Sequence, residues 1–303
     1  MLEDKLAVDS VKREGYLRSH TWLLLVLALV VTAGIIIFIT SVPNSTDKMK
    51  NIATATSQYV FDVPNPIAPQ PQASPNLYLK NAVPILMYHY IRDYANPNDP
   101  LGVGLSVSPV VFKAQLDQLK QAGYQTLSLT NFIARNIQPK SVILTFDDGY
   151  DNHYTAVLPI LKEEGMTGTF FIIHDLIGQP GYMTANQIAN LKNQGMELGD
   201  HTLDHLDLAT LSYAKAYQQI EGANTADLSP VFAYPSGEYN QQTIDILQSV
   251  GEKAAVTTKL GIATDLTDPY QLPRIRVQQN TNVVSAIQKQ MLLIHPEFTQ
   301  AIP

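Results

Sequence analysis

Residues 141–150, SVILTFDDGY, constrain the fold more than any other stretch of the 303-residue chain. Apolar residues occupy both faces of this segment, which is typical of a parallel strand covered on both sides. The segment ends in two adjacent carboxylates, Asp147 and Asp148, and then Gly149. Adjacent like charges repel, so a strand end keeps them only where a cation or a shared proton offsets them. For this motif alone, an acidic turn shaped by Gly149 is the alternative interpretation.

A second polar cluster, HTLDH at residues 201–205, follows another short strand-like segment. His201 and His205 are spaced so that both imidazoles can point the same way on a helical turn or a tight loop. Imidazole with carboxylate is a common ligand set for zinc and similar metals. Two histidines and one carboxylate leave coordination positions open, as a catalytic metal requires. Together with the carboxylate pair, this cluster predicts a metal site.

Alternating strand and helix patterns begin at Val83 and predict a barrel of parallel strands ringed by helices, an α/β fold. Strands are expected at 83–89, 125–129, 141–146, 167–174, 196–201, 231–235, 253–258 and 273–277. Helices are expected at 108–123, 153–164, 184–193 and 283–292. Active sites in such barrels gather at the C-terminal strand ends. The residues expected at those ends are His89, Asp147, Asp148, His201 and Ser236.

The two motifs together, TFDDG and H-T-x-x-H, resemble those of the polysaccharide deacetylases that share the NodB homology domain, carbohydrate esterase family 4. The resemblance covers residues 83–277. It implies a distorted barrel of seven or eight strands and a general-base role for Asp147. It also implies that Asp148, His201 and His205 hold one divalent metal, usually Zn²⁺, with Ni²⁺ or Co²⁺ as alternatives.

The general acid has two candidates. Most of the family uses a Leu-x-His motif near the C-terminus, and Leu293, Ile294 and His295 have that form. The branch that deacetylates poly-N-acetylglucosamine carries the equivalent strand at the front of the domain, and residues 85–89 (ILMYH) resemble this permuted version. We favour His89 because it ends a predicted strand, whereas His295 follows a predicted helix and precedes a proline.

The third motif of the family departs from its usual form here. The usual arginine orients the catalytic aspartate, but Ala233 stands near that position and Ser236 replaces the usual tyrosine. Arg274 is the candidate to replace the missing arginine beside the aspartate. Alternatively, Arg274 forms only a surface salt bridge. The resemblance also suggests that the Ser236 N–H contacts the oxyanion. Tyr234 is a candidate substrate contact that could equally be ordinary packing. The family's Asp-x-Trp motif is missing, because Trp22 is the only tryptophan.

A continuous apolar run at residues 22–40 precedes the predicted domain. As a helix it would be about 28 Å long, close to the thickness of a hydrocarbon core. Basic residues are more numerous before this run than shortly after it, so the positive-inside rule predicts a cytoplasmic N-terminus. A cleaved signal peptide is the alternative. The expected organisation is a cytoplasmic tail (1–20), a transmembrane signal anchor (21–41), a Pro-rich extracellular linker (42–81), the deacetylase domain (82–280), and a C-terminal helix and tail (281–303).

Composition narrows the function further. The net charge of −7 argues against a nucleic-acid partner, and the absence of cysteine excludes disulfides and thiolate metal ligands. The apolar run predicts a membrane anchor, and the resemblance implies an enzyme that removes N-acetyl groups from poly-N-acetylglucosamine-type exopolysaccharide or peptidoglycan. No obligate protein partner is expected. The alternatives are an O-acetyl polysaccharide esterase and an inactive glycan-binding module.

Overall fold

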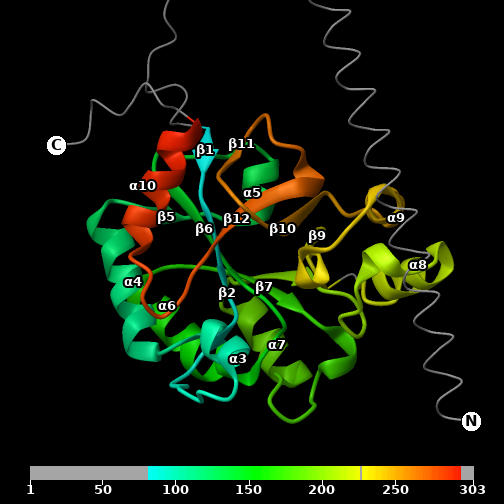
Figure 1. Cartoon of the computed structure of the whole chain (residues 1–303), viewed down its shortest axis with the longest axis horizontal. Helices are drawn as coiled ribbons and strands as arrows, with labels where there is room; N and C mark the ends of the chain where they lie inside the picture. The colour runs from blue at the N-terminus through cyan, green and yellow to red at the C-terminus, as the bar shows by residue number, and fades with distance from the viewer. Residues whose placement is uncertain (1–80, 226, 295–303) are drawn as a thin grey trace, which may run out of the picture. The chain divides into compact units, whose positions relative to one another are not determined.

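The computed structural model describes residues 81–225 and 227–294 (Figure 1). The predicted anchor, almost all of the predicted linker, and His295 lie outside these residues. Within the described part of the chain, no helix has the length and apolar character needed to cross a membrane.

Parallel strands form a closed barrel at the centre of the described domain (Figure 1). In order around the barrel they are β2 (Ile85–Tyr88), β12 (Leu272–Arg276), β10 (Ala254–Leu260), β9 (Val231–Ala233), β8 (Glu197–Asp200), β7 (Thr169–Ile172) and β6 (Ser141–Phe146). The barrel closes because β6 pairs with β2. The short strand β5 (Gln125–Thr126) pairs with the first residues of β6. The predicted barrel of parallel strands is confirmed, and each predicted strand has its counterpart among these eight.

Two shorter strand pairs flank the barrel. Strand β1 (Ala82–Val83) pairs in antiparallel fashion with β11 (Ala263–Thr264). Strand β3 (Tyr90–Ile91), which continues the chain just beyond β2, pairs in parallel with β4 (Ser106–Val107). The second pair shapes the segment that follows His89.

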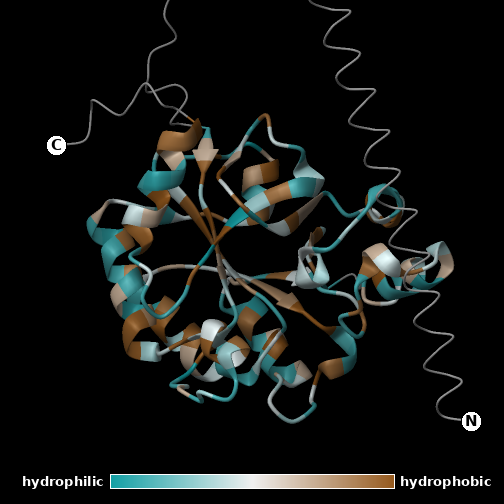
Figure 2. Ribbon diagram, in the orientation of Figure 1, coloured by the Kyte–Doolittle hydropathy of each residue, from teal (hydrophilic) through white to brown (hydrophobic). Residues whose placement is uncertain are grey.

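Helices surround the barrel and carry both hydrophobic and hydrophilic residues (Figure 2). They are α3 (Pro100–Gly104), α4 (Pro109–Gln121), α5 (Leu129–Ile133), α6 (Leu158–Glu164), α7 (Ala185–Asn193), α8 (Tyr213–Glu221), α9 (Gln241–Val250) and α10 (Val283–Ile294). Helices α4, α6 and α10 lie on one side, and α8 and α9 lie on another (Figure 1). The four predicted helices are present, whereas α3, α8 and α9 were not predicted.

Local sequence explains where the predicted helices begin. The Ser108 side chain caps α4 by accepting a hydrogen bond from the Val111 N–H, with proline at the first helical position. Thr184 and Gln187 form a reciprocal capping box at the start of α7. The helix predicted at 153–164 begins as a π-helix, η1 (His153–Val157), before continuing as α6.

Period-two alternation along the strands separates the inside of the barrel from the outside. One core cluster takes members from strands all around the barrel, including Ile85, Ile143 and Leu272. The residues next to them in sequence, such as Leu86 and Leu144, belong to a different cluster. Ile85, Ile143 and Leu272 point into the barrel. Farther along the same strands, toward the C-terminal mouth of the barrel, the inward-facing side chains become polar. Those residues form the site described below.

Candidate metal centre and catalytic groups

Asp147 and Arg274 form a buried ion pair at the C-terminal end of β6. Arg274 donates through Nη1 to Oδ1 and through Nη2 to Oδ2, each at 2.7 Å. The arginine is 1% exposed and the aspartate 3%. Arg274 Nε also donates to the Thr257 carbonyl at 2.8 Å, and Nη1 donates to Thr145 Oγ1 at 3.0 Å. These contacts fix the guanidinium, so Arg274 forms a buried ion pair rather than a surface salt bridge.

The ion pair determines the protonation state of Asp147. Burial alone would raise the pKa of this carboxyl group, but the charge and hydrogen bonds of Arg274 outweigh burial and lower the pKa overall. Asp147 is therefore a carboxylate at neutral pH. It can accept a proton there, as a general base must.

Replacing Arg274 with methionine should lower the free energy of unfolding by about 3–5 kcal/mol, because Asp147 would remain buried without its partner. The lowered pKa of Asp147 stabilises the folded chain above the unfolded-state value of 3.8 and ceases to do so as pH falls through the folded-state value. The difference between wild type and variant should therefore be fully present at neutral pH and shrink in strong acid. Unfolding of the full chain across this pH range measures it.

The double variant Arg274→Met/Asp147→Asn provides the control for this prediction. Removing the buried charge together with its partner should restore part of the lost stability. Equal stability of Arg274→Met and wild type at neutral pH would contradict the assigned ion pair.

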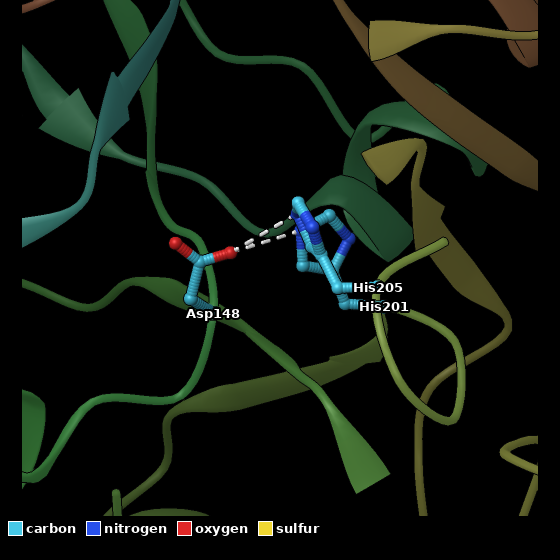
Figure 3. Close-up of side chains that lie close together, drawn as sticks. All are labelled: Asp148, His201 and His205. Carbon is cyan, nitrogen blue, oxygen red and sulfur yellow. Dashed lines mark ion pairs between the residues drawn. The ribbon is translucent and has the colours of Figure 1, made fainter. Parts of the chain in front are cut away.

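Asp148, His201 and His205 converge on one point at the mouth of the barrel (Figure 3). Asp148 Oδ1 lies 3.2 Å from His201 Nε2 and 3.5 Å from His205 Nε2. The three candidate ligand atoms all lie within 4.8 Å of one another. Asp148 follows β6 and the two histidines follow β8, so the closed barrel brings together segments that are distant in sequence.

The hydrogen bonds around this triad fit a metal ion. His201 Nδ1 lies 2.7 Å from the Ala233 carbonyl oxygen, which can only accept, so Nδ1 carries the proton. In the neutral ring, Nε2 then presents its lone pair to Asp148. Asp148 Oδ1 is buried and has no hydrogen-bond partner among the described residues. Two acceptors that face each other require a proton or a cation between them, and the donor set suits a divalent metal.

Electrostatics inside the triad favour a positive charge beside Asp148. Burial opposes ionisation of His201, but Asp148 outweighs it and raises the pKa of His201, so a proton or a cation is drawn between the two side chains. Burial opposes ionisation of Asp148, but the neighbouring imidazoles, above all His201, outweigh it and lower the pKa of this carboxyl group. Burial lowers the pKa of His205, which favours the neutral ring that binds metals. The triad therefore offers an ionised carboxylate to a cation at neutral pH.

Backbone strain is concentrated around the same residues. Asp148, Thr202, His205 and Ser236 have positive φ values of 81°, 69°, 64° and 55°. Such left-handed conformations of non-glycine residues cost about 1–3 kcal/mol each and persist only where surrounding contacts hold them. In the histidine loop, Asp200 Oδ1 accepts from the Thr202 N–H at 2.7 Å, and Thr202 Oγ1 accepts from the His205 N–H at 3.0 Å. These bonds hold the ligands in position.

His89 lies beside Asp147. Its Nε2 is 3.9 Å from Asp147 Oδ2, and its side chain is 14% exposed. Burial lowers the pKa of His89, although the two neighbouring aspartates partly offset this effect. The geometry brings His89 close to Asp147, while His295 lies outside the described residues. The choice of His89 as the general acid stays a prediction.

His153 supports the strand end that carries His89, a structural role that no sequence motif specifies. The side chain is fully buried, and its Nε2 donates to the His89 carbonyl oxygen at 2.7 Å. His153 therefore holds the strand end that carries His89. His153 lies at the start of the helix that follows the DDG motif, and nothing in the local sequence indicates this contact. The contact forms only when β2 and β6 pair.

The segment after β9 brings Ser236 to the mouth of the barrel but not Tyr234. Tyr234 is almost fully buried outside the barrel, where its hydroxyl donates to the Tyr270 carbonyl at 3.0 Å. The alternation of strand faces explains this placement, because Ala233 points inward and Tyr234 outward. Ser236 follows in η4 (Pro235–Gly237). Gly237 is required there, because it has φ +80° and a Cβ would lie 2.1 Å from Thr258 Oγ1.

Aromatic rings line the segment next to the triad. Tyr90 and Tyr150 stack with ring centroids 3.7 Å apart, and Tyr182 lies 5.3 Å from Tyr150. Burial, reinforced by the charge of Asp148, raises the pKa of Tyr150, so its hydroxyl stays protonated. Tyr150 is buried and the Arg92 guanidinium lies 3.6 Å from the Tyr90 ring centroid, so these rings pack against one another and against Arg92 beside the candidate metal site.

The chain resembles known deacetylases across this region. The family described as Polysaccharide deacetylase matches residues 134–255. YxkH of Bacillus subtilis, which is named as a polysaccharide deacetylase, is 34% identical over 208 residues, covering 64% of this chain and 71% of YxkH. The poly-beta-1,6-N-acetyl-D-glucosamine N-deacetylase of Staphylococcus epidermidis is 25% identical over 235 residues, covering 67% of this chain and 81% of that protein.

A solved structure shares both fold and sequence with the described domain. The Streptococcus pyogenes deacetylase PplD, in complex with acetate, superposes with a TM-score of 0.63 at 32% identity. The match covers 69% of this chain and 98% of PplD.

Proposed function

The chain belongs to the polysaccharide deacetylase family, and from this premise we propose that it hydrolyses N-acetyl groups on a cell-surface polysaccharide with the help of one divalent metal ion. The observation that carries the proposal is the adjacency of an arginine-paired carboxylate, Asp147, and the triad of Asp148, His201 and His205. One carboxylate is available as a base while the other is available as a ligand. Metal-assisted hydrolysis needs both.

Each residue then has a separate task. Asp148, His201 and His205 would hold the metal, which when bound acts as a Lewis acid toward the acetyl carbonyl and an attacking water. Asp147 removes the proton from that water, and Arg274 keeps the carboxylate oriented and ionised. As the C–N bond of the amide breaks, His89 delivers a proton to the departing amine. The products are acetate and a glycan with a free amino group.

Ser236 has a supporting task in this scheme. Its backbone N–H is proposed to donate to the oxyanion that develops on the acetyl group. Ser236 has a left-handed backbone conformation, with φ 55°, which sets the orientation of the backbone at this residue. Tyr234 has no direct part, because its side chain packs outside the barrel.

Zinc is the metal that we propose. Three ligands drawn from imidazole and carboxylate, with positions left open for water and substrate, are typical of catalytic zinc sites. Nickel and cobalt tolerate similar ligands and are the alternatives.

The proposed location is the outer face of a cell membrane. Support comes from the sequence alone, through the apolar run at 22–40 and the excess of basic residues before it. The Pro-rich segment at 42–81 would then act as a spacer between membrane and domain. The substrates to test are poly-N-acetylglucosamine, which the name of the Staphylococcus epidermidis relative specifies, and peptidoglycan.

Metal removal should abolish acetate release. The full chain, treated with a chelator and dialysed, is expected to release no acetate above background from N-acetylglucosamine oligomers or peptidoglycan. One equivalent of Zn²⁺ should restore the rate, because the protein ligands remain in place. Mg²⁺ at the same concentration is the control, since it prefers oxygen ligands and near-octahedral geometry. Release that persists after complete metal removal would contradict the proposed mechanism.

A further inference from the structure

Two consecutive side chains, Asn152 and His153, hold the backbone on both sides of Tyr90. His153 Nε2 donates to the His89 carbonyl oxygen at 2.7 Å. Asn152 Oδ1 accepts from the Ile91 N–H at 2.9 Å. Asn152 and His153 together form a clamp around the segment that carries the proposed general acid.

The clamp begins where backbone pairing between β2 and β6 ends. The register of the two strands runs as far as Tyr88 and Phe146, and the Asp147 N–H donates to the Tyr88 carbonyl at 3.0 Å. Just beyond, the rings of Tyr90 and Tyr150 stack with their centroids 3.7 Å apart. The two chain segments therefore stay in contact past the end of the sheet, and the proposed base and general acid are held as one unit.

The ring of His89 depends on its own backbone for its position. Within the described part of the chain, this ring forms no hydrogen bond, and its ion-pair contact with Asp147 Oδ2 is 3.9 Å long. The ring is attached to the backbone through two side-chain torsions that occupy preferred rotamers. A shift of the backbone at His89 would therefore move the imidazole relative to Asp147.

His153 is suited to a fixed contact beside ionisable groups. Its side chain is fully buried, with its ring centroid 5.8 Å from that of Phe146 and 5.7 Å from that of Phe170. Burial lowers the pKa of His153 to about 4, so the ring is neutral at neutral pH and keeps its one proton on Nε2, facing the carbonyl. His153 also begins the π-helix η1, and such turns occur frequently at functional sites.

We propose that Asn152 and His153 are positioning residues that hold His89 where it can deliver a proton to the departing amine. This proposal rests on the proposed function and adds two residues to it. As the C–N bond breaks, its electron pair goes to nitrogen, which takes the proton from His89. Loss of the clamp should slow this step and leave the three candidate metal ligands in place.

The test compares two acetyl substrates that differ in their need for an acid. The amide nitrogen of an N-acetylglucosamine oligomer must be protonated to depart, whereas p-nitrophenyl acetate releases a stable phenolate without a proton. His153→Phe keeps an aromatic ring in the buried position and removes the donor. In the metal-loaded full chain it should lower kcat for the oligomer about 100-fold, the effect of a misplacement of about 1 Å. KM for the oligomer and the rate with the ester should stay at wild-type values.

Further variants separate the clamp from general damage to the fold. Asn152→Ala leaves the buried ring in place and should lower kcat for the oligomer about ten-fold, the worth of one hydrogen bond. His153→Gln keeps an N–H donor and should retain an intermediate kcat. Tyr270→Phe is the matched control, because it removes a hydrogen bond of 2.9 Å from an aromatic side chain to the Glu252 carbonyl, and it should leave both rates unchanged.

The His89→Ala background shows whether the clamp acts through His89. In that background His153→Phe should cause no further loss, because the general acid is already absent. Calorimetric titration with Zn²⁺ should give wild-type affinity for both clamp variants.

The proposal is overturned if the clamp variants keep wild-type rates, lose oligomer and ester hydrolysis equally, bind Zn²⁺ more weakly, or add to the loss in His89→Ala. The background comparison decides by itself if wild type leaves the ester intact. Failure of the proposed function would look different, since wild type would then release no acetate from any glycan.

Discussion

Asp147→Asn is expected to reduce kcat/KM for acetate release by about 10²–10⁴-fold, the usual contribution of a general base. Asparagine matches the shape of aspartate but cannot accept the proton of the attacking water. The loss should appear in kcat, because proton transfer occurs in the transition state and not in substrate binding. Acetate released from N-acetylglucosamine oligomers by the metal-loaded full chain measures the effect.

Measuring the metal content of Asp147→Asn distinguishes a loss of catalysis from a loss of the metal site. Asp147 is bonded to Arg274 and is not one of the triad, so Asp147→Asn should bind as much metal as wild type. The matched control is Asp227→Asn, which alters an aspartate whose side chain is 91% exposed and should leave activity unchanged. Wild-type activity in Asp147→Asn would remove Asp147 from the mechanism. Loss of metal in that variant would mean that this carboxylate is a ligand.

His205→Gln is expected to weaken metal binding by at least about 100-fold. Mutating a residue that only hydrogen-bonds to a metal ligand lowers metal affinity about 10–100-fold. His205 is proposed as a direct ligand, so its loss should have at least as large an effect. Its side chain is 34% exposed, so the substitution leaves the buried core intact. Calorimetric titration of the metal-free full chain with Zn²⁺ measures affinity and stoichiometry together. Wild type should bind one ion per chain.

His174→Gln is the matched control for the metal prediction. His174 is also a partly exposed histidine, at 42%, but it lies in η2 (His174–Leu176) and outside the triad. It should bind Zn²⁺ with wild-type affinity. Unchanged affinity in His205→Gln, or equal loss in both variants, would contradict the assignment of ligands.

The barrel was predictable because its strands are short apolar runs that end at polar residues. The run at 141–146 is fully buried, as its sequence suggests. Helix starts were predictable where a strong cap was present, as at Ser108 and Thr184. Helix α9 carries a comparable signal that was missed, because Asn240 is a strong N-cap residue and forms a capping box with Thr243. Its buried residues Ile244 and Leu247 are spaced as on one face of a helix, so this apolar face was also visible in the sequence.

The candidate site was predictable in part. The motif residues Asp148, His201 and His205 meet because parallel strands deliver their C-terminal ends to one mouth. The contact between Arg274 and Asp147 depends on the closure of the barrel, which sequence spacing alone does not reveal. Strand alternation would have placed Tyr234 outside the barrel once the inward position of Ala233 was known. The contact of His153 with the His89 carbonyl is a tertiary hydrogen bond without a local sequence signal.

The most direct test of the proposed chemistry counts two products in one reaction. The metal-loaded full chain is incubated with an acetylated glycan, and acetate and newly formed primary amines are quantified in the same sample. Hydrolysis of N-acetyl groups predicts equal amounts of the two, rising together with time. Acetate without amines would indicate an O-acetyl esterase, and the absence of both products from every glycan tested would indicate a binding module; either result would contradict N-deacetylation.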